Sequence, residues 1–296
     1  MKKWTASPAP AGRVAYVNCR YLPHRHAGVH IEDRSLQLGD GIYEVAAIMS
    51  GRLVDEEEHL DRLERSLREI GMAMQMGRPA LKLVMREMVA RNRVSNGLLY
   101  MQVSRGAVRR DHPIPDNPPR PTLIMTVRAQ DPAAGEKKRI EGIAVITRPD
   151  QRWARRDIKT VQLLPNLLAK TEARKAGAYE AWLVDSDGFV TEGASTNAWI
   201  VDSQNQVVTR QLSNDILPGV TRRVILEAAE AAGLPVIERK FSVAEALTAR
   251  EAFLSSASGA AIPVVKIDDT IIADGKPGPL TRRIHKLYAQ KAGIES

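Results

Sequence analysis

The decisive segment of this chain reads RRDIKTVQLLPNLLAKTEARKAGAYEAWLVDSDGFVTEGASTNAW from Arg155 to Trp199. Pro165 suits the first position of an apolar helix, which Gly177 would end. Two strands are expected on either side of Asp187-Gly188, a dipeptide typical of hairpin turns. The segment predicts a strand-rich α/β fold in which one lysine, Lys159, precedes a helix and one glutamate, Glu192, follows a hairpin.

The flanking sequence extends the same pattern on both sides. Alternating or β-branched apolar runs predict strands, and apolar residues at helical spacing predict amphipathic helices. The strands are expected at 14–21, 42–49, 98–104, 122–127, 143–147, 198–201, 206–209 and from Ala252, and the helices at 55–70, 79–92, from the turn at Gly219 to 232, and 280–289. Residues 129–141 are polar and are expected to be flexible, so we predict a smaller N-terminal α/β domain (1–128), a linker (129–141) and a larger C-terminal domain (142–296).

Composition limits the function classes. The formal net charge of +8 invites a nucleic-acid interpretation, but the basic residues come in scattered pairs and aromatic residues make up only 4%. We therefore predict no nucleic-acid partner, and a basic nucleic-acid-binding protein remains the non-enzyme alternative. One cysteine, Cys19, excludes an intramolecular disulfide and a thiolate-rich metal site, and no metal is expected. No apolar run follows Met1-Lys-Lys-Trp, which predicts a cytoplasmic protein without a signal peptide or membrane span.

Lys159 and Glu192 are the residue types that pyridoxal phosphate chemistry needs, a lysine for a Schiff base and a carboxylate that keeps a ring nitrogen protonated. With 43 Lys and Arg and 35 Asp and Glu, a Lys–Glu pair taken at random is surface charge far more often than part of a site. The turn at Gly219 opens a helix whose first amides, on Val220 and Thr221, could bind a phosphate or could be a plain helix cap. Helical periodicity alone makes Arg62 a solvated charge.

The order of the motifs resembles that of the fold-type IV (class IV) pyridoxal phosphate-dependent aminotransferases, and within them the D-amino acid aminotransferases. The resemblance covers nearly the whole chain. Its motifs are Asn18, Ile31-Glu-Asp-Arg through Gly39-Asp-Gly-Ile-Tyr-Glu-Val, His59-Leu-Asp-Arg-Leu, Arg105-Gly with Arg110 and His112, Asp157-Ile-Lys, Glu192-Gly, Leu217-Pro-Gly-Val-Thr-Arg and Ser255-Ser-Ala-Ser. It implies a two-domain α/β (α+β) homodimer with the cofactor in the interdomain cleft.

The resemblance also implies roles for individual residues. Lys159 would form the Schiff base and move the proton between substrate Cα and cofactor C4′, and Glu192 would hold the pyridinium nitrogen. The phosphate ligands would be Arg62, the amides of Val220 and Thr221, and the loop of Ser256, Ala257 and Ser258. The substrate carboxylate would be bound by Tyr43, Arg110 and His112.

The implied activity is reversible amino transfer between a D-amino acid (D-alanine, D-glutamate) and a 2-oxo acid (2-oxoglutarate, pyruvate). The arrangement of Arg110 and His112 favours this subfamily over the branched-chain L-amino acid aminotransferases and aminodeoxychorismate lyase, which remain alternatives. Arg110 could also be part of a basic surface loop. The sequence departs from the family pattern at Cys19, Leu36, Leu38, Arg109 and Ala257, and Arg109 leaves open which arginine faces the substrate.

Overall fold

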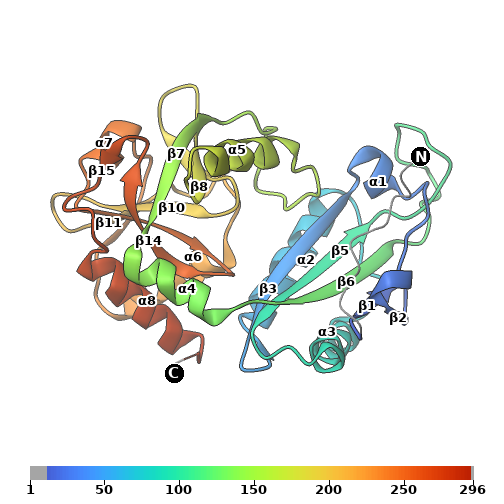
Figure 1. Cartoon of the computed structure of the whole chain (residues 1–296). Coiled ribbons are helices and arrows are strands. Elements are labelled where there is room, and N and C mark those ends of the chain that lie inside the picture. Colours follow the sequence, from blue (N-terminus) through green and yellow to red (C-terminus); the bar gives the residue numbers. More distant parts are fainter. Residues whose placement is uncertain (1–11, 295–296) are drawn as a thin grey trace, which may run out of the picture. The chain divides into compact units, whose positions relative to one another are not determined.

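The computed structural model describes residues 12–294, in two compact units (Figure 1). Of the described residues, the first unit contains 12–130 together with Lys159–Gln162, and the second contains Asp131–Ile158 and residues 163–294. The N-terminal residues whose composition predicts no signal peptide lie outside the described part. Between residues 12 and 294 no helix is both long and apolar enough to cross a membrane.

The first unit is built on a six-stranded antiparallel sheet of order β2-β1-β6-β5-β3-β4. Its strands are β1 (Val14–Val17), β2 (Arg20–Pro23), β3 (Gly41–Met49), β4 (Arg52–Leu53), β5 (Gly97–Ser104) and β6 (Thr122–Ala129). Its helices are η1 (His24–His26), α1 (Arg34–Leu38), α2 (Glu56–Glu69) and α3 (Arg78–Asn92). The strand predicted over 14–21 is instead a hairpin, because Asn18 and Cys19 both have positive φ and reverse the chain.

Side-chain alternation gives this sheet two different faces. Helix α2 packs against β3, and α3 packs against β1, β4 and β6. On β5, Leu99, Met101 and Val103 are buried, whereas the side chains between them, including Tyr100, are half-buried. Because β5 pairs with β3 in antiparallel register, Tyr43 belongs to the half-buried face and Glu44 to the helix-covered face.

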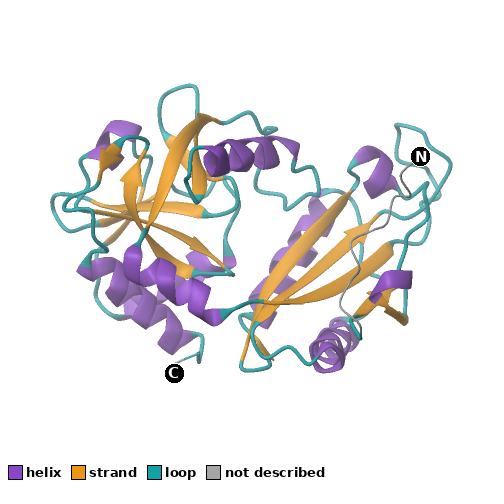
Figure 2. Cartoon of the chain, in the orientation of Figure 1, coloured by secondary structure: helices purple, strands orange, loops and turns teal. Residues whose placement is uncertain are grey.

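The second unit has a mixed nine-stranded sheet of order β12-β11-β10-β13-β14-β7-β8-β9, with β15 paired to β14. Its strands are β7 (Ile143–Pro149), β8 (Glu180–Val184), β9 (Val190–Gly193), β10 (Asn197–Val201), β11 (Val207–Thr209), β12 (Val236–Glu238), β13 (Glu251–Ser256), β14 (Ala260–Ile267) and β15 (Thr270–Ile271). Its helices are α4 (Pro132–Glu141), α5 (Leu164–Lys175), α6 (Val220–Ala231), α7 (Val243–Leu247) and α8 (Pro279–Lys291). Figure 2 shows the helices, strands and loops of each unit in separate colours.

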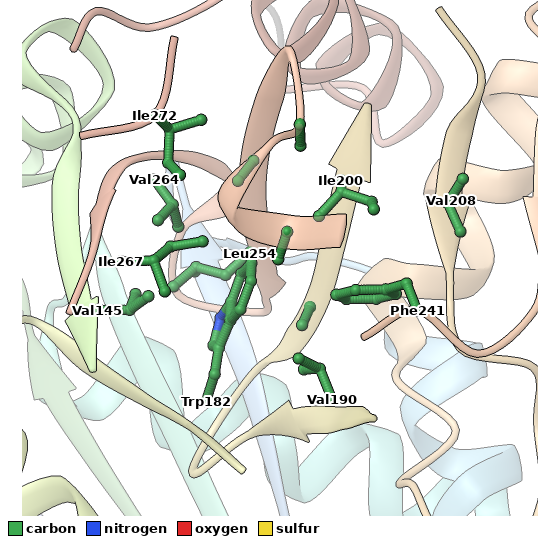
Figure 3. Packing of buried hydrophobic residues seen from close by; sticks show 14 of the residues in the cluster. Val145, Trp182, Val190, Ile200, Val208, Phe241, Leu254, Val264, Ile267 and Ile272 are labelled. Atoms are coloured by element: carbon green, nitrogen blue, oxygen red, sulfur yellow. The ribbon is translucent and has the colours of Figure 1, made fainter. Parts of the chain in front are cut away.

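Large apolar clusters hold the second unit together. One is centred on Trp182, Leu254 and Phe241, with the Trp182 and Phe241 rings edge to face at 6.1 Å (Figure 3). In another, the rings of Trp199 and Phe253 stack at 5.2 Å and are covered by α6 and α8. Burying such large aromatic surfaces fixes the strands on which the polar side chains of this unit are carried.

Within the linker predicted over 129–141, residues 132–141 form a helix and not a flexible segment. Asp131 accepts a hydrogen bond from the amide of Ala133, and Pro132 occupies the first turn, so the segment forms helix α4. The division into units falls at Gln130, and the short segment Lys159–Gln162 belongs to the first unit although its sequence neighbours belong to the second. A polar composition predicts flexibility, but it suits an exposed helix equally well.

Candidate active site

Lys159 lies on a short extended segment that pairs with the beginning of β3. The amide of Tyr43 donates to the carbonyl of Lys159 at 3.0 Å, and the amide of Val161 donates to the carbonyl of Gly41 at 3.1 Å. The half-buried Lys159 side chain places its Nζ 4.3 Å from the centre of the Tyr43 ring. Backbone pairing therefore brings together Lys159, the predicted Schiff-base lysine, and Tyr43, one of the predicted substrate-binding residues.

Tyr43 is itself supported from the next strand. Its ring stacks on that of Tyr100 with 5.6 Å between centres. The Tyr100 hydroxyl donates to Gln102 at 2.7 Å, and burial raises the pKa of Tyr100 to about 12. This hydroxyl therefore stays protonated at neutral pH, and the ring that supports Tyr43 adds no charge to this face of the sheet.

Arg62 belongs to the helix-covered side of the same sheet. Its Nε and Nη2 donate to Glu44 at 2.7 and 2.8 Å, and His59 Nδ1 lies 2.8 Å from the same carboxylate. Burial alone would raise the pKa of Glu44, but Arg62 and His59 outweigh burial and hold that pKa well below its ordinary value. Arg62 is thus a buried, oriented cation and not the solvated charge that periodicity alone predicts. Sequence analysis did not assign its partner, Glu44.

The predicted carboxylate-binding residues Arg110 and His112 lie on the loop that follows β5. Both are exposed, as is Arg109. Within residues 12–294 their side chains form no hydrogen bond or ion pair, whereas the His112 amide donates to Asp111 at 2.8 Å. Their side chains are therefore available to a ligand, and the backbone of the loop decides their positions.

In the second unit, Glu192 is surrounded by donors at the end of β9. Arg152 Nη1 donates to Oε1, Asn197 Nδ2 donates to Oε2 at 2.9 Å, and the Leu217 amide lies 3.1 and 3.2 Å from the two oxygens. Only 4% of Glu192 is exposed. Burial raises the pKa of Glu192 and Arg152 opposes the rise. An environment of donors suits an ionised carboxylate, which can accept a further N–H.

Arg152 is a residue of this site that sequence analysis missed. It bridges Glu192 and Asp150, donating to Asp150 through Nε at 2.9 Å and through Nη2 at 2.8 Å. Asp150 also accepts a hydrogen bond from Thr191 at 2.8 Å. The only sequence signal is a polar Asp-Gln-Arg run directly after a strand, at 150–152, which is too common to be specific.

The start of α6 has free backbone donors. Gly219 is its N-cap and provides no side-chain cap, so the amides of Val220 and Thr221 are not satisfied by a side chain. A methyl group on Gly219 would lie 2.0 Å from Asn197 Oδ1, so any larger residue there would displace the Asn197 side chain. The amides at this helix start could bind the phosphate of a ligand whose pyridine nitrogen faces the neighbouring Glu192.

The predicted phosphate loop is the turn between β13 and β14. The Oγ atoms of Ser256 and Ser258 lie 3.2 Å apart, and Ala257 between them contributes no hydroxyl. The preceding residue, Ser255, accepts a hydrogen bond from Trp199 Nε1 at 2.9 Å. Helix α6 packs against β13, so the turn and the helix start belong to one packed substructure.

The chain belongs to the class IV aminotransferases. The model of the family described as amino-transferase class IV matches residues 41–267, a range that contains Tyr43, Lys159 and Glu192. The enzyme class and its pyridoxal phosphate cofactor follow from this membership. Among the described residues, no group of three His, Cys, Asp or Glu side chains could hold a metal ion.

Curated relatives agree with this assignment, and solved structures share the fold. The D-alanine aminotransferase of Bacillus licheniformis is 39% identical over 267 residues, 90% of this chain and 93% of the relative. That of Listeria innocua is 36% identical over 276 residues, 93% and 94% of the two chains. The fold is similar to that of the branched-chain amino acid aminotransferase of Escherichia coli, with a TM-score of 0.84, 22% identity and coverage of 96% of each chain. At such identity the structural match shows the fold alone.

Proposed function

We propose that this chain is a D-amino acid transaminase that transfers an amino group reversibly between a D-amino acid, such as D-alanine or D-glutamate, and a 2-oxo acid, such as 2-oxoglutarate or pyruvate. The observation that carries the proposal is the similarity to D-alanine aminotransferases of several bacteria over nine-tenths of the chain. The branched-chain aminotransferases share the fold at only 22–23% identity, and this gives no support for their substrates.

The residues present fit the cofactor. Pyridoxal phosphate, when bound, supplies an electron sink for the bond that breaks at the substrate Cα. Glu192 would accept a hydrogen bond from the ring nitrogen, as an ionised carboxylate held by Arg152 and Asn197. The amides of Val220 and Thr221 and the turn at Ser256, Ala257 and Ser258 would hold the phosphate. Arg62, whose orientation Glu44 fixes, is proposed as a further phosphate ligand.

Lys159 would transfer the proton between the substrate Cα and the cofactor C4′. Such a transfer requires a lysine whose backbone is held in place while its amine can move from one atom to the other. Pairing to β3 holds the Lys159 backbone in place, and the Tyr43 ring next to Nζ limits the directions in which the amine can move. Tyr43, Arg110 and His112 would bind the substrate carboxylate.

The test is the visible absorption spectrum of the purified protein, followed by addition of single amino acids. We expect the band of bound pyridoxal phosphate to be lost with D-alanine and to persist with L-alanine and L-leucine. Lys159→Ala should abolish this response, while Lys170→Ala, a lysine on α5 paired with Glu180 at 3.0 Å, should leave it intact. Loss of the band with L-leucine alone would make the chain a branched-chain enzyme.

We propose further that the enzyme is a cytoplasmic homodimer. Leu164, Leu167 and Leu168 form an apolar stripe on α5 and are 66%, 58% and 54% exposed, which supports coverage by a second copy. The single exposed cysteine is in keeping with a reducing compartment. Light scattering after size exclusion would give twice the chain mass for a dimer, and Leu167→Glu should shift the mass toward the monomer.

A further inference from the structure

We propose that Arg34 is a positioning residue for substrate binding, because its guanidinium holds the backbone of the loop that carries Arg110 and His112. The inference rests on the proposed function, in which these two side chains bind the substrate carboxylate. Arg34 lies at the start of α1 and is 3% exposed, so its side chain contacts the surrounding protein and not the solvent.

Three successive carbonyl groups of the loop converge on the Arg34 guanidinium. Nη1 donates to the carbonyl of Asp111 at 2.8 Å and to that of Pro113 at 3.4 Å. Nη2 donates to the carbonyl of His112 at 3.4 Å. A planar guanidinium can address several acceptors at once, whereas a lysine ammonium on a flexible stem cannot reproduce this arrangement.

The backbone around Arg34 holds the other end of the same loop. The Arg34 amide donates to the carbonyl of Gly106 at 2.9 Å, and Asp33 and Ala107 form an isolated antiparallel bridge. The Asp33 side chain accepts a hydrogen bond from Ser104 at 2.8 Å. Both the beginning and the middle of the loop are therefore attached to one short segment, residues 33–34.

The charges explain why these contacts persist. Arg34 Nε and Arg105 Nε donate to the same oxygen of Asp40, at 2.7 and 2.8 Å. Burial alone would raise the pKa of Asp40, but the two arginines outweigh it and lower that pKa. Two buried cations share one carboxylate, so one positive charge remains to be stabilised by carbonyl dipoles. Arg105 Nη2 donates to the carbonyl of Ile70 at 2.7 Å, and the Arg34 guanidinium donates to the carbonyl groups of the loop.

The consequence for binding follows from the exposure of Arg110 and His112. No partner within the described residues orients their side chains, so their positions depend on the backbone between them. Without the Arg34 contacts, that backbone would have to be ordered each time a carboxylate binds. The substrate would then bind more weakly, while the chemistry at Lys159, on a different segment, would proceed at nearly the same rate.

The experiment compares Arg34→Met with Arg105→Met, both as cofactor-loaded full-length protein. Each variant leaves Asp40 with one arginine and therefore a balanced buried charge, but only Arg34→Met releases the loop carbonyls. We expect the KM for D-alanine and for 2-oxoglutarate to rise about 10-fold or more in Arg34→Met, with kcat within about 3-fold of wild type. Arg105→Met should keep KM near wild type, and Arg34→Lys should fall between.

Hydrogen exchange measured by mass spectrometry separates the anchoring from a general loss of stability. Peptides covering residues 107–116 should exchange faster in Arg34→Met and not in Arg105→Met, while peptides from β3 and β5 stay unchanged. Unchanged loop exchange, or faster exchange with an unchanged KM, would overturn the inference. If wild-type protein does not transaminate D-alanine at all, the proposed function fails and this inference falls with it; the wild-type assay identifies that case.

Discussion

Replacing Arg152 by methionine would leave the Glu192 carboxylate buried without its cation. Asn197 and the Leu217 amide would remain as donors, and Asp150 would keep Arg156, whose Nε lies 3.4 Å away. Removing one partner of a buried ion pair costs about 3–5 kcal/mol, because the remaining charge stays desolvated. For a domain of this size that corresponds to a decrease of roughly 10 °C in the Tm of the cofactor-free protein.

The pH dependence of this loss has a defined sign. Burial raises the pKa of Glu192 above its unfolded value of about 4.3, so the ionised carboxylate destabilises the folded state above that pH. Arg152 opposes the rise, and its loss would raise the pKa further. The Tm difference between wild type and Arg152→Met should therefore be large at pH 8 and should narrow as the pH falls toward about 4, where Glu192 is protonated in both proteins.

A double variant tests the cause. Arg152→Met with Glu192→Gln removes the buried charge, and we expect it to recover most of the lost Tm without recovering transamination. Thermal unfolding at pH 5 and pH 8, followed by circular dichroism, compares wild type, the two single variants and the double variant on one scale. A double variant as unstable as Arg152→Met, or a Tm loss independent of pH, would refute the argument that an unpaired Glu192 carboxylate is responsible.

Three further outcomes are expected. Glu44→Gln should lower the free energy of unfolding by about 3 kcal/mol at pH 7. Because the pKa of Glu44 is depressed, wild type loses this contribution as the pH falls below about 4. The Tm values of the two proteins, measured against pH, should therefore converge at low pH. Gly219→Ala places a methyl group 2.0 Å from Asn197 Oδ1 and should weaken pyridoxal phosphate binding about 10-fold in an absorbance titration; an unchanged affinity would contradict the role given to the helix start. Gly106→Ala, at φ +102° and 2.1 Å from the carbonyl oxygen of Arg120, should lower the stability by about 1–3 kcal/mol in urea unfolding.

The sequence by itself determined most of the local elements and the family, although not helix α4 or the β1–β2 hairpin. Helices α2, α3 and α5 have apolar residues at helical spacing, and the β8–β9 hairpin has its Asp-Gly turn; these signals act over a few residues and need no tertiary contact. The order of the motifs identified a class IV aminotransferase, which the family match confirms. The site roles of Lys159 and Glu192 stay predictions.

Only the tertiary structure decided which charges are paired. Glu44 and Arg62 are 18 residues apart, and Arg152 and Glu192 are 40 apart, so no local pattern links them. A buried charge needs a partner of opposite charge. The sequence has 78 charged residues, which allow far too many possible pairs for the actual partners to be predicted. For the same reason the sequence, in which Arg34 is only the last residue of the Ile31-Glu-Asp-Arg motif, does not reveal that its guanidinium contacts three carbonyl groups of a distant loop.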